Sequence, residues 1–280
     1  MQLRCGRYRV DLVTPVVMGV LNVTPDSFAD GGRHTTRAAA LAQAERMAEE
    51  GAAIIDVGGE STRPGARPVA ADEELRRVLP VVEDLVARLA VPVSVDTRHA
   101  AVMSAALGAG ASMINDIAAL REPGALAAVA ASDAAVCLMH MRGEPHGMQD
   151  APVYADVAAE VLGFLRARVA ACRAAGIDAG RLVVDPGFGF GKTLAHNLEL
   201  LRRLPELAAD GVPVLAGLSR KSMVGQLTGR GVGERLPGSL ALAVLAVLGG
   251  ARIVRAHDVG PTVDAVKVAA AFAGERNGTA

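Results

Sequence analysis

Residues 181–193 read RLVVDPGFGFGKT, an apolar run that ends in an aspartate and a glycine-rich loop. A phosphate loop of the NTPase kind needs Gly, any four residues and then Gly-Lys-Ser/Thr. Counting back from Gly191-Lys192-Thr193 puts the first glycine at position 186, where the chain has Pro186, with a fixed φ and no N–H. The dinucleotide pattern G-x-G-x-x-G fails too, because the three glycines are spaced by two throughout. The stretch is therefore interpreted as the end of a strand and a loop of another kind.

Seven further apolar runs alternate with longer stretches of helical pattern. Near-continuous apolar strands between helices are typical of a parallel sheet covered by helices. Eight such units in one chain predict a (β/α)8 TIM barrel, with a doubly wound open sheet as the structural alternative. The segment before the first run, MQLRCGRYRVDL, fits a short N-terminal β-hairpin that closes the bottom of the barrel. The eight runs begin at Val16, Ala53, Val91, Ser112, Ala135, Arg181, Val212 and Ala251.

Local signals place two of the helices. Gly51 is expected to stop the first one, and Asp72 is the expected N-cap of the second, over residues 71–89. No repeat, low-complexity segment or linker divides the chain, so we expect a single domain over residues 1–280.

The composition excludes several classes of protein. Of the 280 residues, 51% are hydrophobic, which is ample for one barrel core, and only 2% are aromatic, which disfavours a stacking surface for nucleic-acid bases. The formal net charge of −1 gives no attraction to nucleic acid or to an anionic membrane. Cys5, Cys137 and Cys172 show no C-x-x-C spacing, which indicates free thiols in a reducing compartment. The N-terminus lacks an apolar signal core, and the most apolar run, from Leu240, is about half of a membrane span. We expect a soluble cytoplasmic protein.

Every predicted strand ends in polar residues, and active sites of barrels lie at these carboxyl ends. A single Asp after a strand is usually a helix cap or a solvated carboxylate, and a lone histidine such as His140 can be a satisfied core residue. Polar groups at one end of all eight strands weaken that interpretation, because no packing rule places them there. In chain order the ends carry Asn22, Glu60, Asp96, Asn115 with Asp116, His140, Asp185, Ser219 with Arg220 and Lys221, and Arg255 with His257 and Asp258.

These side chains sort by charge into two groups. Asp96, Asn115 and Asp185 supply acceptors and a donor for the edge of a neutral heterocycle rich in N–H groups. Lys221 either neutralises one of the carboxylates and donates to a ring carbonyl, or forms a purely structural Lys–Asp pair. The second group is cationic and polar and is suited to bind phosphate; it comprises Asn22, Arg63, Arg255 and His257. The sequence thus predicts a site for a polar ring joined to an anion.

The loop after the sixth run contributes the wall of this site. Its glycines let the backbone turn tightly beside a ligand. Phe190 offers a flat apolar face to an aromatic ring, whereas Phe188 is expected to pack against the neighbouring helix.

The ordered motifs of the chain resemble those of dihydropteroate synthase. They cover nearly the whole chain, from Met18 to about His257, and comprise MGVLNVTPDSFADGG, DVGGESTRPGA, SVDT, INDI, LMHM, DPGFGFGK, GLSRKS and RAHDV. The resemblance implies a (β/α)8 barrel, usually a homodimer. It also implies a reaction that joins 6-hydroxymethyl-7,8-dihydropterin diphosphate to 4-aminobenzoate, releases diphosphate and makes dihydropteroate for folate synthesis.

The resemblance also implies roles for individual residues. It assigns the pterin to Asp96, Asn115, Asp185 and Lys221, and the diphosphate to Arg255 and His257. Asn22 helps to bind Mg²⁺ with the diphosphate. Asp30, Thr62 and Arg63 belong to loops that close over the site, and Phe28, Phe190 and Ser222 match positions around the aminobenzoate. The implied catalytic residues are Asp96, Lys221, Arg255 and His257.

The expected mechanism follows from charge. A neutral arylamine attacks once the diphosphate is helped to leave, so no Ser–His or Cys–His pair is needed, and a dissociative path and a direct displacement both remain open. One rival function is methyl transfer from a methylated folate by a pterin-binding barrel, which would need no diphosphate group at Arg255 and His257. The other is a paralogue that binds pterin without turnover, against which the complete set of polar strand ends argues.

Overall fold

The structure is a computed structural model that describes residues 1–23, 33–60, 69–143, 147–149 and 151–277. Eight parallel strands are ordered β8-β7-β6-β5-β4-β3-β10-β9, and an isolated parallel bridge from Val184 to Val214 joins the two ends of this order. The closure excludes the open doubly wound sheet and confirms the predicted (β/α)8 TIM barrel. The strands are β3 (Val16–Asn22), β4 (Ile54–Gly58), β5 (Val93–Asp96), β6 (Met113–Asp116), β7 (Ala135–Met139), β8 (Leu182–Asp185), β9 (Leu215–Gly217) and β10 (Ile253–Ala256).

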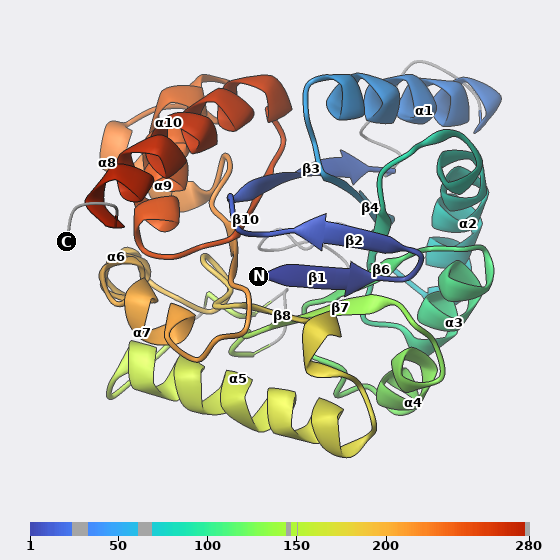
Figure 1. The fold of residues 1–280 in the computed structure, drawn as a ribbon, viewed down its shortest axis with the longest axis horizontal. Helices are drawn as coiled ribbons and strands as arrows, with labels where there is room; N and C mark the ends of the chain where they lie inside the picture. The colour runs from blue at the N-terminus through green and yellow to red at the C-terminus, as the bar shows by residue number, and fades with distance from the viewer. Residues whose placement is uncertain (24–32, 61–68, 144–146, 150, 278–280) are drawn as a thin grey trace.

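Helices surround the strands (Figure 1). Their inner faces and the outward-facing strand residues form one large apolar cluster, so the short apolar runs are buried on both sides, as parallel strands require. The helices are α1 (Arg33–Glu49), α2 (Ala71–Arg88), α3 (Ala100–Gly108), α4 (Ala125–Ala130), α5 (Val157–Ala174), α6 (Leu194–Arg202), α7 (Leu204–Ala208), α8 (Ser222–Thr228), α9 (Leu236–Leu248) and α10 (Val259–Asn277).

The N-terminal hairpin covers the end of the barrel at which the strands begin, and this end faces the viewer in Figure 1. Strands β1 (Gln2–Cys5) and β2 (Tyr8–Asp11) pair antiparallel. Leu3, Cys5, Val10 and Leu12 of this segment pack on residues from the barrel strands, among them Met18 and Ile253, in a second apolar cluster. The predicted hairpin and its place at the bottom of the barrel are confirmed.

Two expectations about helix ends have different outcomes. Gly51 follows α1 with φ of +100°, a left-handed conformation that glycine adopts at low cost. Asp72 is not the N-cap of α2: Ala70 holds that position without a side-chain cap, so this prediction is wrong. Asp72 lies within the first turn with Glu73 and Glu74, where a carboxylate favours the helix dipole without capping it.

The three cysteines are buried and free, as expected. No helix in the described part of the chain is long and apolar enough to cross a membrane.

Strand register brings the polar strand ends to one level. Asn22 lies opposite Gly58, Gly58 opposite Asp96, and Asp96 opposite Asn115 in successive parallel pairs. Arg255 lies opposite Gly217 on the far side of the barrel mouth.

Candidate active site

Eight of the twelve predicted substrate-binding residues, and the predicted metal ligand Asn22, lie in the described part of the chain. Phe28, Asp30, Thr62 and Arg63 lie outside the described residues.

Asp185 and Lys221 face each other across Gly217. A Cβ added to Gly217 would lie 3.9 Å from Lys221 Nζ and 4.0 Å from Asp185 Oδ2, so the bare glycine forms a floor between the two side chains. The other oxygen of Asp185 accepts from the Gly187 N–H at 2.7 Å, which leaves Oδ2 directed to the floor. Burial raises the pKa of Asp185, and Lys221 opposes the rise. Burial likewise lowers the pKa of Lys221 to about 8, against the attraction of Asp185. We call this place the ring floor.

Asp56 forms hydrogen bonds with two of the predicted site residues, Asn115 and Arg255. This fully buried carboxylate of β4 accepts through Oδ2 from Asn115 Nδ2 at 3.0 Å and from Arg255 Nε at 2.6 Å. The contact with Asn115 uses one of the two N–H groups of its amide, so its second N–H and its carbonyl oxygen remain for a ligand. Asp56 Oδ1 is buried and has no hydrogen-bond partner among the described residues.

Arg255 bridges Asp56 and Asp96. Its Nη2 donates to Asp96 Oδ2 at 2.8 Å, while the side chain stays 21% exposed. Burial raises the pKa of Asp96 to about 7, and the charge of Arg255 opposes the rise. Burial acts against the charged form of Arg255, but Asp56 and Asp96 outweigh it and raise its pKa. In the described structure the guanidinium is thus held by two carboxylates at the edge of the mouth.

The remaining predicted residues lie around this core. His257 Nδ1 and Ser219 Oγ are 3.0 Å apart, which ties the end of β10 to the loop after β9. Ser222 is the exposed first residue of α8. Phe190 is half-buried against a methionine-rich cluster, and Lys221 Nζ lies 4.6 Å from the centre of its ring. Phe188, predicted to pack against the neighbouring helix, is fully buried in the large apolar cluster.

Asn22 and Asp96 meet over a second bare glycine, Gly58. A Cβ there would lie 3.8 Å from Asn22 Oδ1 and 3.9 Å from Asp96 Oδ2. Both atoms are oxygens that can act as metal ligands. Mg²⁺ commonly binds one or two protein oxygens together with substrate phosphate oxygens. The residues present therefore fit the predicted ion. We call this place the anion floor.

A separate acidic group lies between the ends of β4 and β5. One ligand atom from each of Glu60, Glu74 and His99 lies within 4.8 Å of the other two. Both His99 nitrogens already face oxygens, of Glu122 at 3.1 Å and of the Val69 carbonyl at 3.3 Å. Burial raises the pKa of Glu74 to about 8, so this carboxyl readily takes up a proton. The oxygen-only set at the anion floor suits Mg²⁺ better than this mixed group.

The conformation of the loop after β8 explains why it contains three glycines. Gly187, Gly189 and Gly191 all have φ between +61° and +79°. A Cβ on Gly187 would lie 1.9 Å from the His140 carbonyl oxygen, and one on Gly191 would lie 2.3 Å from that of Arg142. The loop therefore presses its backbone against the segment after β7, and only glycine fits there. Thr193 of the same motif caps α6 in a capping box with His196.

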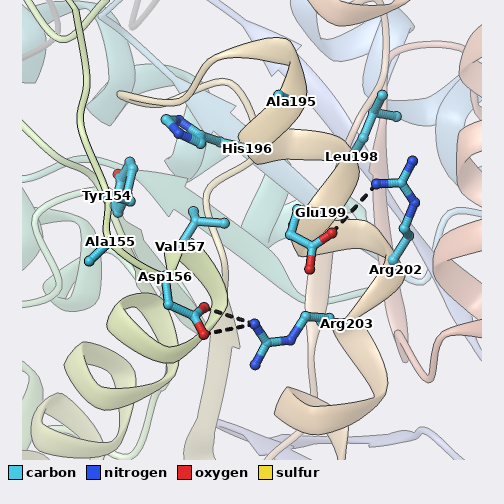
Figure 2. Close-up of a pocket in the computed structure, with 10 residues that line it drawn as sticks. All are labelled: Tyr154, Ala155, Asp156, Val157, Ala195, His196, Leu198, Glu199, Arg202 and Arg203. Atoms are coloured by element: carbon cyan, nitrogen blue, oxygen red, sulfur yellow. Dashed lines mark hydrogen bonds and ion pairs between the residues drawn. The ribbon is translucent and has the colours of Figure 1, made fainter.

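A surface pocket of about 590 Å³ lies behind this loop, on the outside of the barrel between the start of α5 and α6 (Figure 2). Its arginines are paired with carboxylates: Arg203 with Asp156 at 2.8 Å and Arg202 with Glu199 at 3.5 Å. Tyr154 on its wall donates to the Gly191 carbonyl at 2.9 Å. Tyr154 thus holds the loop from the outside, and both arginines among the described residues of the pocket are paired with carboxylates.

The sequence analysis gives no role to two buried charged residues at the mouth, Asp56 and Lys192. For Asp56 the signal is a charge inside the apolar run AIIDVGG, which can be buried only with partners. For Lys192 it is a lysine in a loop that fails as a phosphate loop and still needs a role.

Comparisons with known proteins identify the family of the chain. Residues 18–257 match the model of a family described as pterin binding enzyme. The dihydropteroate synthase of Escherichia coli (strain K12) is 54% identical over 259 residues, which cover 92% of each chain. A solved Xanthomonas albilineans dihydropteroate synthase with 4-aminobenzoic acid is 56% identical, with a TM-score of 0.91 and 97% of both chains covered. The same organism's enzyme in complex with 7,8-dihydropteroate is 52% identical, with a TM-score of 0.88 and 97% and 98% covered. The chain belongs to the pterin-binding enzymes and, among them, to the dihydropteroate synthase family.

Proposed function

We propose that the chain joins 6-hydroxymethyl-7,8-dihydropterin diphosphate to 4-aminobenzoate at the barrel mouth and releases diphosphate. The observation that carries the proposal is the pair of bare glycines at this level. Gly217 lies among Asp185 and Lys221, and Gly58 lies between Asn22 and Asp96. One floor suits a flat ring and the other an anion with its metal ion, so the two together fit one substrate that contains both.

The ring is bound edge-on by buried groups. Asp185 Oδ2 and the Asn115 carbonyl oxygen accept from ring N–H groups, and Lys221 donates to a ring carbonyl. Asp56 acts as a positioning residue, since its contact with the Asn115 amide nitrogen fixes which way that amide points.

The diphosphate lies toward Asn22, with Arg255, His257 and Arg63 as its cationic and polar partners. When bound, Mg²⁺ at Asn22 supplies positive charge to the leaving diphosphate. Arg255, with its donors held by Asp56 and Asp96, is already oriented at the mouth, so little reorganisation is needed as negative charge grows.

Bond exchange takes place at the exocyclic carbon of the pterin. Its C–O bond to the diphosphate breaks, the nitrogen of 4-aminobenzoate forms the new C–N bond, and that nitrogen then loses one proton. Asp96 lies beside the anion floor and acts electrostatically on Lys221 of the ring floor, so its carboxylate can stabilise positive charge at this carbon. Phe190 and Ser222 are the described residues of the proposed arylamine subsite, to which the family resemblance also assigns Phe28, Thr62 and Asp30.

We further propose that the chain acts in the cytoplasm as a homodimer of one barrel domain, residues 1–280. The family resemblance supports the homodimer, and the three free buried cysteines support a reducing compartment such as the cytoplasm. Light scattering of the purified chain measures its oligomeric state, and a monomeric mass at working concentration would contradict the dimer.

A diphosphate-release assay tests the reaction. Both substrates with Mg²⁺ should release diphosphate and form dihydropteroate, and omission of Mg²⁺ or of 4-aminobenzoate should strongly reduce release. Asp185→Asn should weaken pterin binding in calorimetry, because an amide presents a donor where an acceptor is needed. Methyl transfer from a methylated folate without diphosphate release would favour the rival function, and pterin binding without turnover would indicate the non-catalytic paralogue.

A further inference from the structure

Lys192 is one of only three lysines in the chain, and it is 2% exposed. Its Nζ donates to the carbonyls of Gly187 at 2.9 Å and Phe190 at 3.1 Å, and lies 3.0 Å from His140 Nδ1. The His140 carbonyl is a fourth, longer contact at 3.4 Å. All of these described partners are neutral oxygens or a ring nitrogen, so Lys192 sits in the middle of a ring of acceptors.

The protonation of the pair fits this geometry. Burial lowers the pKa of His140 to about 3, with the charge of Lys192 as the second cause. His140 is therefore neutral at ordinary pH, and its Nδ1 lone pair accepts from Lys192 while the proton resides on Nε2.

The loop around Lys192 has every carbonyl engaged from Gly187 to Gly191. Lys192 binds the carbonyls of Gly187 and Phe190, and Lys221 binds that of Phe188. Gln149 binds the carbonyl of Gly189, and Tyr154 that of Gly191. Two of these five bonds come from one buried side chain, Lys192. The Gly187 carbonyl also accepts from the Phe190 N–H at 3.1 Å, so loss of Lys192 would leave the Phe190 carbonyl without its partner.

Asp185 and Phe190 depend on Lys192 to different degrees. Asp185 belongs to β8, and its carbonyl accepts from the His140 N–H at 3.0 Å in continuation of the sheet. Phe190 lies beyond the sheet, and its carbonyl is held by Lys192 alone among the described hydrogen bonds. Loss of Lys192 should therefore move the phenylalanine and leave the backbone of Asp185 in place. The Asp185 carboxylate would lose only one of the charges that favour its ionised form, since Lys221 and Arg255 remain.

We propose that Lys192 is a positioning residue for the arylamine subsite: it holds the loop after β8 so that the Phe190 ring forms a fixed wall there. The proposal rests on the proposed function for the identity of the ligand. Lys192 contacts neither substrate, so its effect passes through the Phe190 backbone.

The test is Lys192→Met, which keeps the length and apolar stem of the side chain and removes the nitrogen that donates to the loop. We expect the KM for 4-aminobenzoate to rise about tenfold, as expected for the loss of one to two hydrogen bonds. The KM and calorimetric Kd for the pterin substrate should change less than about threefold. Lys267→Met, on the exposed face of α10, is the matched control and should change neither.

A second measurement does not need turnover. The chain has five phenylalanines, so ¹³C-phenylalanine NMR can follow each ring. The Phe190 signal should shift or broaden in Lys192→Met, while that of exposed Phe272 stays unchanged. If Lys192→Met does not fold, Lys192→Gln retains a shorter uncharged donor and should show an intermediate KM.

The outcomes separate the two proposals. A folded Lys192→Met with an unchanged KM for aminobenzoate and an unchanged Phe190 signal would overturn the role of Lys192. Equal losses for both substrates would also overturn it, because they indicate general damage to the mouth. If the wild-type chain releases no diphosphate, the proposed function fails, while the NMR comparison still decides whether Lys192 fixes Phe190.

Discussion

The two ends of the barrel use the same eight strands and opposite kinds of side chain. Where the strands begin, Leu3 and Leu12 of the hairpin segment are buried on apolar residues such as Met18 and Ile253. Where they end, Asp56, Asp185 and Lys192 are buried as well, but every one of them can carry a charge. Burial of charge costs free energy unless it is paired, whereas burial of apolar surface stabilises the fold. The bottom therefore serves stability, and the mouth retains costly groups that either meet a ligand, as Asp185 does in the proposed function, or hold other residues in place.

Removal of a charge partner at the mouth should have the largest effect. Arg255→Ala leaves Asp56 and Asp96 buried together without their cation, which should lower the free energy of unfolding by about 3–5 kcal/mol. The same change should remove about 2–4 kcal/mol of diphosphate-dependent binding or transition-state stabilisation. Urea unfolding and kcat/KM measure the two losses.

Arg252 offers a control from the other end of the same strand. It precedes β10, and its guanidinium donates to the Val13 carbonyl at 2.8 Å near the surface. Arg252→Ala should cost less than about 1 kcal/mol and leave kcat/KM unchanged. If Arg255→Ala in an Asp56→Asn background costs as much stability as it does alone, the two side chains are not coupled and the described pairing is not what holds Arg255.

A cavity at the bottom should lower stability without touching the chemistry. Leu3 is fully buried, so Leu3→Ala should cost about 3 kcal/mol of unfolding free energy. Since Leu3 contacts the starts of the strands, both KM values should stay at their wild-type levels. Val13→Ala, at a position 65% exposed, is the control and should be nearly neutral. A raised KM in Leu3→Ala would show that the two ends are coupled and break the division between them.

The two lysines of the mouth, Lys192 and the half-buried Lys221, should make stability depend on pH. Burial lowers the pKa of Lys192 to about 7 and of Lys221 to about 8, from an ordinary 10.5. Between the folded and unfolded pKa values of these lysines, the unfolded chain binds more protons than the folded chain. The free energy of unfolding therefore rises with pH across this window and falls as the pH falls toward 7. Each lysine contributes at most about 1.4 kcal/mol per pH unit in this window.

Lys192→Met removes one of these contributions. Urea unfolding at pH 7 and pH 8.5 should give a shallower rise for Lys192→Met than for the wild type, and groups common to both cancel in the difference. Lys267→Met should keep the wild-type slope. Identical slopes for Lys192→Met and the wild type would mean that Lys192 keeps an ordinary pKa in the folded protein.

The sequence predicts the strands better than the contacts between them. The eight apolar runs correspond to β3–β10 because a short buried strand is encoded by its own residues. The polar strand ends, such as Asp96 and Asp185, were predictable for the same reason. The partners of Asp56 were not, because Asn115 and Arg255 lie 59 and 199 positions away and meet it only through strand register. Lys192 likewise finds His140 52 positions away.

Addition of a single methyl group to either floor of the mouth tests whether the two floors bind different parts of the substrate. Gly217→Ala adds one methyl group at ordinary contact distance from Arg255, Lys221 and Asp185, so the free protein accommodates it. Gly58→Ala does the same beside Asn22 and Asp96. Both glycines lie at the ends of strands and neither needs a left-handed backbone, so each variant should change the unfolding free energy by less than about 1 kcal/mol.

The two variants should differ in the ligand that they reject. A methyl group on the ring floor occupies space that the pterin needs, so Gly217→Ala should weaken binding of a pterin without diphosphate about tenfold, the cost of modest overpacking. Gly58→Ala should leave that affinity unchanged and weaken only the extra affinity that diphosphate and Mg²⁺ together provide. Calorimetry with both pterins, with and without Mg²⁺, measures the four affinities for each variant. Equal losses for both ligands in both variants would mean that the mouth is one undivided pocket, because a methyl group on either floor would then obstruct the whole substrate.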